Sequence, residues 1–306
     1  MSIAFFGTPD FAVPSLRSLA GAGEEIHIVV TQPDRVKGRG HKLSAPPVKT
    51  ASVEMGLPVL QPDTLKDAIL VEQLISHRLE FIIVVAYGKI LPGSILELPR
   101  GGCINLHASL LPKCRGAAPI AWSIIRGEKK TGISTMLMDE GLDTGPILMQ
   151  QEFEIHEEDT ALTLGQKLSV AGAFLLSKTI QGMREGSLKP VPQTGEPTYA
   201  PLLRKEDGII NWHKSAEEIS RTVRGLQPWP GAQCTLNNEK VILIKSTPLE
   251  GTGIPGTIVM IKKDEIIIGT GRGLLALTML QPSGKKAMSA SAFLQGRALI
   301  VGTPVQ

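Results

Sequence analysis

Four short, mostly apolar runs in the first 110 residues constrain the fold more than any other feature of the chain. The two central runs, "IHIVVT" and "FIIVVAYG", are almost wholly apolar, so neither face of these strands suits contact with water. Strands that are apolar on both faces are typical of a parallel sheet covered by helices on both sides. The four runs predict strands at residues 3–7, 26–31, 81–88 and 102–107.

Stretches with helical periodicity separate these strands. They predict helices at residues 11–21, 45–55, 65–79 and 118–127, and a long amphipathic helix at 160–184. Two further strands, 131–138 and 147–155, flank a glycine-rich turn. Strands that alternate with helices predict an α/β domain with a Rossmann-like, open and mostly parallel sheet.

The pattern changes towards the C-terminus. Residues 186–206 contain four prolines and little periodicity, which is typical of a connector between domains. Short alternating strands follow, joined by Asn, Gly and Lys/Asp turns, as in a small β-barrel of the OB type. We therefore predict a catalytic domain at 1–188, a linker at 189–206 and a β-barrel domain at 207–306.

Composition narrows the class of protein. No charged segment precedes an apolar signal-like run, and no apolar run has membrane-spanning length, so we expect a cytoplasmic protein without a membrane partner. Three scattered cysteines fit reduced thiols, and no His/Cys spacing indicates a metal. Residues 204–306 hold 13 Lys/Arg and 8 Asp/Glu, so a net charge of +5 lies in the rear of a chain whose total is +3. This asymmetry favours a polyanionic partner for the C-terminal part.

A dinucleotide site does not fit the first strand and its turn. The Rossmann fingerprint needs several glycines after that strand, and "FFGTPDF" supplies only Gly7. "GTGRGLL" at 269–275 lies among the barrel strands and is interpreted as a turn, and no GxxxxGK[ST] motif is present. We therefore reject a nicotinamide or ATP site.

Asn105 and His107 stand two residues apart at the end of a predicted strand. Residues two apart face the same side of a sheet, and in open α/β sheets ligands bind beyond the carboxyl ends of the strands. The pair is therefore a candidate for substrate contact. The alternative is that both side chains hydrogen-bond a neighbouring loop.

Asp143 lies between Gly141 and Gly145, in a loop free to bring a carboxylate against another strand end. A carboxylate beside an imidazole orients it and favours its charged form. The alternative is an Asp that caps its own turn. Without a marked Ser or Cys nucleophile, the three groups favour direct transfer, and Cys114 is interpreted as a packed structural thiol.

Longer motifs around these residues resemble those of the folate-dependent formyltransferases. The resemblance rests on "INLHASLLPKCRGAAPIAW", "TGISTMLMDEGLDTGPIL", "FFGTPDFAVPSL", "TQPDRVKGRGHKL" and "QPSGKKAMSA", and it covers essentially the whole chain. It implies catalytic roles for Asn105, His107 and Asp143, and a tetrahydrofolate contact at Ser109, Leu110, Leu111 and Pro112. One departure is Cys114, where the family usually has an aromatic residue before the Arg.

The resemblance implies transfer of a formyl group from 10-formyltetrahydrofolate to the α-amino group of methionine on initiator tRNA, as in translation initiation. Two basic groups would hold the tRNA, although each is also explained as solvated surface charge. They are Arg35, Lys37, Arg39 and Lys42 in the loop 31–49, and Lys262, Lys263, Lys285 and Lys286 in the rear domain.

Several alternatives remain open at this level. A formyltransferase for a glycinamide ribonucleotide or a sugar nucleotide, or a formyltetrahydrofolate hydrolase, shares the catalytic signature but gives no reason for the basic loop. A non-catalytic folate- or RNA-binding module would not need all three catalytic groups. Which residue carries which proton is not decided, and we expect a monomer.

Overall fold

The computed structural model describes residues 2–37 and 42–306. The chain divides into two compact units, the first formed by residues 1–119, 131–154 and 165–200, the second by residues 120–130, 155–164 and 201–306. Two short segments, 120–130 and 155–164, thus belong with the C-terminal unit, which the sequence pattern does not indicate. The predicted boundaries at 188 and 206 stay a prediction.

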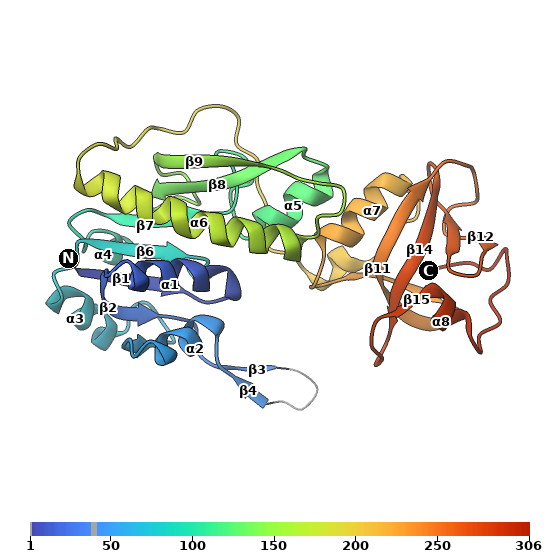
Figure 1. Ribbon diagram of the computed structural model, residues 1–306, viewed down its shortest axis with the longest axis horizontal. Coiled ribbons are helices and arrows are strands. Elements are labelled where there is room, and N and C mark those ends of the chain that lie inside the picture. The colour runs from blue at the N-terminus through green and yellow to red at the C-terminus, as the bar shows by residue number, and fades with distance from the viewer. Residues whose placement is uncertain (1, 38–41) are drawn as a thin grey trace. The chain divides into compact units, whose positions relative to one another are not determined.

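The first unit is built on a seven-stranded sheet with the order β5-β2-β1-β6-β7-β8-β9 (Figure 1). Neighbouring strands from β5 to β7 run parallel, whereas β7 and β8 are antiparallel. The prediction of a mostly parallel sheet is therefore confirmed. The strands are β1 (Ser2–Gly7), β2 (Glu25–Val30), β5 (Val59–Leu60), β6 (Phe81–Val85), β7 (Cys103–His107), β8 (Lys130–Leu137) and β9 (Ile147–Glu154).

Both faces of the central strands are buried, as their composition predicts. One face packs with Leu70 and Leu74 of helix α3 and includes Phe6, Ile28 and Val84. Burial of each such side chain stabilises the fold by about 1.5–3 kcal/mol. The helices and turns of this part of the chain are η1 (Asp10–Ala12), α1 (Val13–Gly21), α2 (Pro47–Glu54), α3 (Ala68–Ser76), α4 (Gly93–Leu96), α5 (Pro119–Arg126) and α6 (Ala161–Arg184).

Helix α6 covers the face of β7 from which Leu106 projects. A Cβ added to Gly172 of α6 would lie 2.7 Å from the Leu106 side chain, and Thr135 of β8 hydrogen-bonds Thr179 of α6 over 2.8 Å. Because side chains alternate along a strand, Asn105 and His107 project from the other face.

The predicted loop 31–49 contains a β-hairpin, β3 (Arg35–Lys37) and β4 (Lys42–Ser44), in which Val36 pairs with Leu43. At its base the Lys49 ammonium lies 2.7 Å from the Asp34 carboxylate, and Gln61 donates to the same carboxylate. These hydrogen bonds, from Lys49 first and then Gln61, hold the pKa of Asp34 below its ordinary value.

The second unit contains an antiparallel sheet with the order β10-β11-β14-β13-β12, and β15 pairs with β14. This confirms the prediction of a C-terminal β domain. Its elements are η2 (Lys205–Gly208), α7 (Ala216–Gly225), β10 (Ala232–Leu236), β11 (Glu239–Leu249), β12 (Ile258–Ile261), β13 (Ile266–Gly269), β14 (Leu274–Pro282), β15 (Met288–Ser289) and α8 (Ala290–Leu294).

Residues 302–306 join the two end strands of this sheet. The Ile258 amide donates to the Thr303 carbonyl over 3.0 Å, and the Val305 amide donates to the Gly256 carbonyl over 2.6 Å. On the other side, Gln306 and Thr235 exchange backbone hydrogen bonds. The C-terminal segment therefore links β12 to β10 and closes the strands into a ring.

Helix α7 begins with a capping box. The Ser215 hydroxyl accepts from the Glu218 amide over 3.2 Å, and the Glu218 carboxylate accepts from the Ser215 amide over 3.0 Å. This satisfies two backbone donors that the first helical turn would otherwise leave unpaired. None of the helices within the described residues combines the length and apolarity that crossing a bilayer requires.

Candidate active site

Three polar side chains of the first unit meet at the carboxyl end of β7. Asn105 and His107 are 8% and 6% exposed, and both face the loop between β8 and β9 that carries Asp143. Asn105 Nδ2 lies 3.5 Å from Asp143 Oδ1, and His107 Nδ1 lies 3.7 Å from Asp143 Oδ2. The structure thus brings together the amide, the imidazole and the carboxylate that the sequence singles out.

The backbone of Asp143 has the left-handed conformation, with φ of 52°. Its carboxylate accepts a 2.7 Å hydrogen bond from the Gly116 amide, so the turn that holds Asp143 is fastened to the segment that follows β7. Nearby, Gly145 approaches the Leu137 carbonyl so closely that no Cβ fits there. Asp143 is therefore not the cap of its own turn.

His107 is oriented by a backbone carbonyl. Its Nε2 lies 3.0 Å from the Cys114 oxygen, and because a carbonyl only accepts, we assign the proton to Nε2. The other nitrogen, Nδ1, then faces Asp143. Cys114 itself has φ of 54°, and its amide donates to the Thr198 hydroxyl over 2.8 Å. Cys114 thus contributes its backbone carbonyl to the site, and its side chain is buried.

The segment from Ser109 to Pro112 is tightly held. The Ser109 hydroxyl donates to the Lys113 carbonyl over 2.6 Å, and the Ser109 carbonyl accepts from Ser134 over 2.6 Å. The Leu111 carbonyl accepts from Gln150 over 3.0 Å, and Leu110 lies against Gly132. Ser109 and Leu111 are buried, so their side chains offer almost no surface to a ligand.

A cavity of about 380 Å³ lies at the same edge of the sheet, beyond β1, β2 and β6. The loops that form it are tied together, because Thr8 and Gln32 both donate to the Tyr87 carbonyl, over 2.9 and 3.2 Å. The sequence reasoning missed these residues, although the rule that ligands bind beyond strand ends applies to them as well. The cavity is lined by Thr8, Pro9, Asp10, Gln32, Pro33, Arg35, Ser44, Ala45, Pro46, Pro47, Ala86, Tyr87 and Gly88.

The basic residues predicted to hold the tRNA lie in both units. Arg35 lines the cavity and donates to Gln32 over 3.2 Å. Lys37 and Lys42 pair in register across the hairpin, and Arg39 lies outside the described residues. In the second unit, Lys262 and Lys263 follow β12 and Lys285 and Lys286 follow β14, with Lys262 paired to Glu265 over 3.0 Å.

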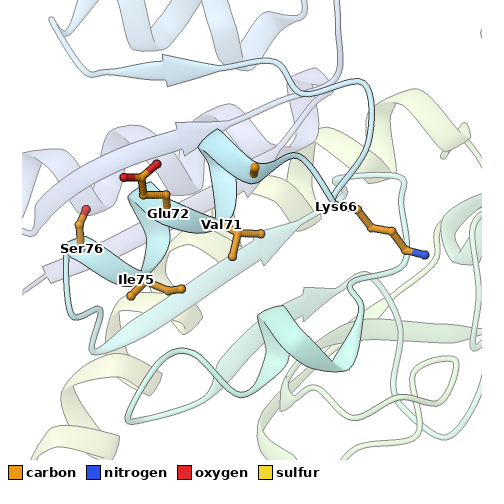
Figure 2. A pocket seen from close by; sticks show the side chains of 6 residues that line it. Lys66, Val71, Glu72, Ile75 and Ser76 are labelled. Atoms are coloured by element: carbon orange, nitrogen blue, oxygen red, sulfur yellow. The ribbon is translucent and has the colours of Figure 1, made fainter.

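A second hollow, of about 500 Å³, lies on the surface of α3 (Figure 2). Its lining consists of Lys66, Ala68, Val71, Glu72, Ile75 and Ser76. None of these residues ends a strand at the carboxyl edge of the sheet, so we place no chemistry there. In the portion that the structure describes, no three His, Cys, Asp or Glu side chains lie close enough to hold a metal ion.

Comparisons with known proteins give a consistent result. Residues 1–180 match the formyl transferase family, and residues 202–298 match the formyl transferase C-terminal domain. The chain is 56% identical over 300 residues to the methionyl-tRNA formyltransferase of Thermodesulfovibrio yellowstonii, covering 98% of this chain and 97% of that protein.

Solved structures show the same fold at low identity. The methionyl-tRNA formyltransferase from Clostridium thermocellum has a TM-score of 0.58 and 19% identity, over 90% of this chain and 99% of that chain. HypX from Aquifex aeolicus in complex with tetrahydrofolic acid has a TM-score of 0.66 and 16% identity. That match covers 98% of this chain and 50% of HypX, so the chain spans about half the length of that protein.

Proposed function

The chain belongs to the formyl transferase family, and from this premise we propose that it transfers the formyl group of 10-formyltetrahydrofolate to the α-amino group of methionyl initiator tRNA. The observation that carries the proposal is the convergence of Asn105, His107 and Asp143 at one strand end, in a chain 56% identical to a methionyl-tRNA formyltransferase.

The reaction requires two kinds of help from the protein. The neutral α-amino nitrogen attacks the formyl carbon, which produces a tetrahedral adduct with an oxyanion and a cationic nitrogen. A proton must then leave the amine and reach the departing folate nitrogen as its bond to carbon breaks. The site therefore needs a donor for the oxyanion and a group that accepts and passes on one proton.

Asn105 is suited to the first task. Its amide is neutral, it has two N–H groups, and only one of them is directed to Asp143. A preorganised donor of this kind stabilises a transition state by about 3 kcal/mol. His107, with Nε2 fixed on the Cys114 carbonyl, has Nδ1 directed towards the Asp143 carboxylate, 3.7 Å from Oδ2.

Asp143 is suited to the second task. Its Oδ2 already accepts from Gly116, whereas Oδ1 has, among the described residues, the long contact of 3.5 Å to Asn105. Oδ1 therefore has capacity to accept the amine proton directly or through water.

The two substrates are assigned to neighbouring parts of the carboxyl edge. The segment Ser109–Pro112 follows β7 closely, and we propose that it contacts the folate donor; the structural relative HypX has been solved in complex with tetrahydrofolic acid. The cavity beyond β1, β2 and β6 suits the aminoacyl end of the tRNA, because Arg35 lines it and the basic hairpin adjoins it.

The proposal is tested by offering the purified protein 10-formyltetrahydrofolate with one acceptor at a time. The acceptors are charged initiator tRNA, charged elongator methionine tRNA, a glycinamide ribonucleotide and an amino-sugar nucleotide. We expect formylation of the initiator tRNA at the highest kcat/KM. Formylation of a nucleotide alone, or release of formate without an acceptor, would replace the proposal with one of the sister reactions.

The same proposal makes the protein a cytoplasmic, monomeric enzyme of translation initiation that needs no metal. Sedimentation of the free protein tests the monomeric state. Assay in the presence of a chelator tests whether activity requires a metal.

A further inference from the structure

The segment 191–200, which we call the strap, fastens the loops around the candidate active site. Figure 1 shows the chain after α6 running past β9. Val191 and Ile147 exchange two backbone hydrogen bonds of 2.8 Å at one end of the strap. At the other end the Arg115 amide donates to the Thr198 carbonyl over 2.8 Å, and the Ala200 amide donates to the Arg115 carbonyl over 2.7 Å. Residues 191–200 are thus hydrogen-bonded to β9 and to the segment after β7, within the first unit.

Gln193 of the strap uses its whole side-chain amide. Its Nε2 donates to the carbonyls of Asp143 and Gly145, each over 2.8 Å. Its Oε1 accepts from the Arg115 guanidinium, over 3.1 Å from Nε and 2.7 Å from Nη2. One neutral amide thus joins the backbone of the Asp143 turn to the side chain of the residue before Gly116.

This arrangement controls where the carboxylate lies. Asp143 is in a left-handed conformation that non-glycine residues adopt at a cost, so its turn needs outside support. The carboxylate oxygen that faces His107 is also the one that accepts from Gly116. Gln193 holds the backbone of the Asp143 turn on one side of that hydrogen bond and the side chain of Arg115, the residue before Gly116, on the other.

We propose that Gln193 is a positioning residue for formyl transfer, acting through Asp143 rather than on either substrate. The inference rests on the proposed function for its kinetic consequence. Displacement of a reacting group by about 1 Å costs on the order of 100-fold in rate. Gln193 does not line the cavity that we assign to the aminoacyl end of the tRNA, so we expect its loss to change KM for the tRNA little.

Two substitutions distinguish the hydrogen bonds that Gln193 donates from the ones that it accepts. Gln193→Met keeps the length and removes every hydrogen bond. Gln193→Glu keeps an acceptor for Arg115 and removes both donors to the Asp143 turn. Thr194→Ala is the matched control, because Thr194 is the exposed neighbour in the same strap.

We expect both Gln193 variants to lower kcat by on the order of 10- to 100-fold, with KM for the aminoacyl-tRNA within about twofold of wild type. The Thr194→Ala variant should match wild type. If Gln193→Met fails to fold, Gln193→Glu decides alone. Wild-type kcat in the Gln193→Glu variant, or a change confined to KM, would overturn the proposal.

A second measurement needs no substrate. The amide proton of Gly116 donates to the Asp143 carboxylate, and its NMR resonance should move upfield in both Gln193 variants but not in the control. An unchanged resonance would contradict positioning by Gln193. Inactivity of the wild-type protein towards methionyl-tRNA would instead contradict the proposed function, while this resonance would still report on the strap.

Discussion

The Gly116 amide donates a 2.7 Å hydrogen bond to Oδ2 of Asp143, although the two residues belong to different loops. The carboxylate is therefore held by backbone before a substrate enters. Hydrogen bonds from backbone N–H groups to a carboxylate are among the stronger ones in proteins, and they fix direction as well as distance. The reactivity of the site should therefore depend on both loops.

Removing the charge of Asp143 should stop chemistry without unfolding the protein. In the Asp143→Asn variant an amide oxygen can still accept from Gly116, so the turn is retained. The variant has no carboxylate to accept the amine proton, and kcat should fall by about 100- to 10,000-fold. Single-turnover assays and thermal melting check this. Glu140→Gln, in the same loop and exposed, is the control, and near-normal turnover of Asp143→Asn would remove Asp143 from the mechanism.

A side chain at Gly116 should damage the same hydrogen bond. Gly116 has φ of 113°, and a Cβ there would lie 2.8 Å from the Ala200 carbonyl of the strap. Gly195 also has a positive φ, of 93°, but faces open space. Both Ala variants should lose about 1–3 kcal/mol of unfolding free energy, and only Gly116→Ala should also lose activity. Urea unfolding and kcat distinguish the two, and equal activity of both variants would contradict the prediction.

The capping box of α7 should give the second unit a pH-dependent stability. The Ser215 hydroxyl first, and the Ser215 amide second, lower the pKa of Glu218 below its ordinary value of 4.5. A lowered pKa contributes stability above the unfolded-state value and loses it as pH falls through the folded-state value. Ser215→Ala should therefore cost about 1 kcal/mol at pH 7 and less at pH 3.

Tryptophan fluorescence can follow this transition, because Trp122, Trp212 and Trp229 all belong to the second unit. Glu217→Gln serves as the control for a neighbouring carboxylate in the first turn of α7. An equal loss of unfolding free energy at both pH values would show that the stability given by the cap does not depend on the protonation of Glu218.

The lysines of the second unit should set the salt dependence of tRNA binding. Replacing Lys262, Lys263, Lys285 and Lys286 by Ala should weaken binding and reduce the slope of log K against log salt by about 0.9 for each phosphate that the protein no longer neutralises. The matched control removes equal charge from the same unit at Lys205, Lys214, Lys240 and Lys245. Equal slopes in the two variants would place the tRNA grip elsewhere.

Much of the first unit could be predicted because its signals are local. Apolar strands and periodic helices are encoded within short windows, and α6 at 161–184 matches the expected 160–184. Short elements were missed for the same reason. β5 has two residues and α4 has four, and neither is long enough to show a period. The hairpin at 35–44 was interpreted as a loop because its strands have only three residues each.

Among the residues of the candidate site, those with a local sequence pattern could also be predicted, and the one without such a pattern could not. Asn105 and His107 were found because their spacing is a strand spacing, and Asp143 because its flanking glycines mark a turn. Gln193 was not found, since its partner Asp143 is 50 residues away and its own neighbours are prolines and exposed polar residues. A hydrogen bond that depends on the path of an irregular segment leaves no local pattern in a sequence.

The ring of strands in the second unit depends on five residues that belong to none of its named strands. If residues 302–306 were removed, Thr235 of β10 and Ile258 of β12 would lose the backbone partners that this segment supplies, and the two strand edges would open to solvent there. Open edges of that kind invite pairing with the strands of another molecule. A truncated protein should then keep its catalytic groups and still be lost from solution as aggregates.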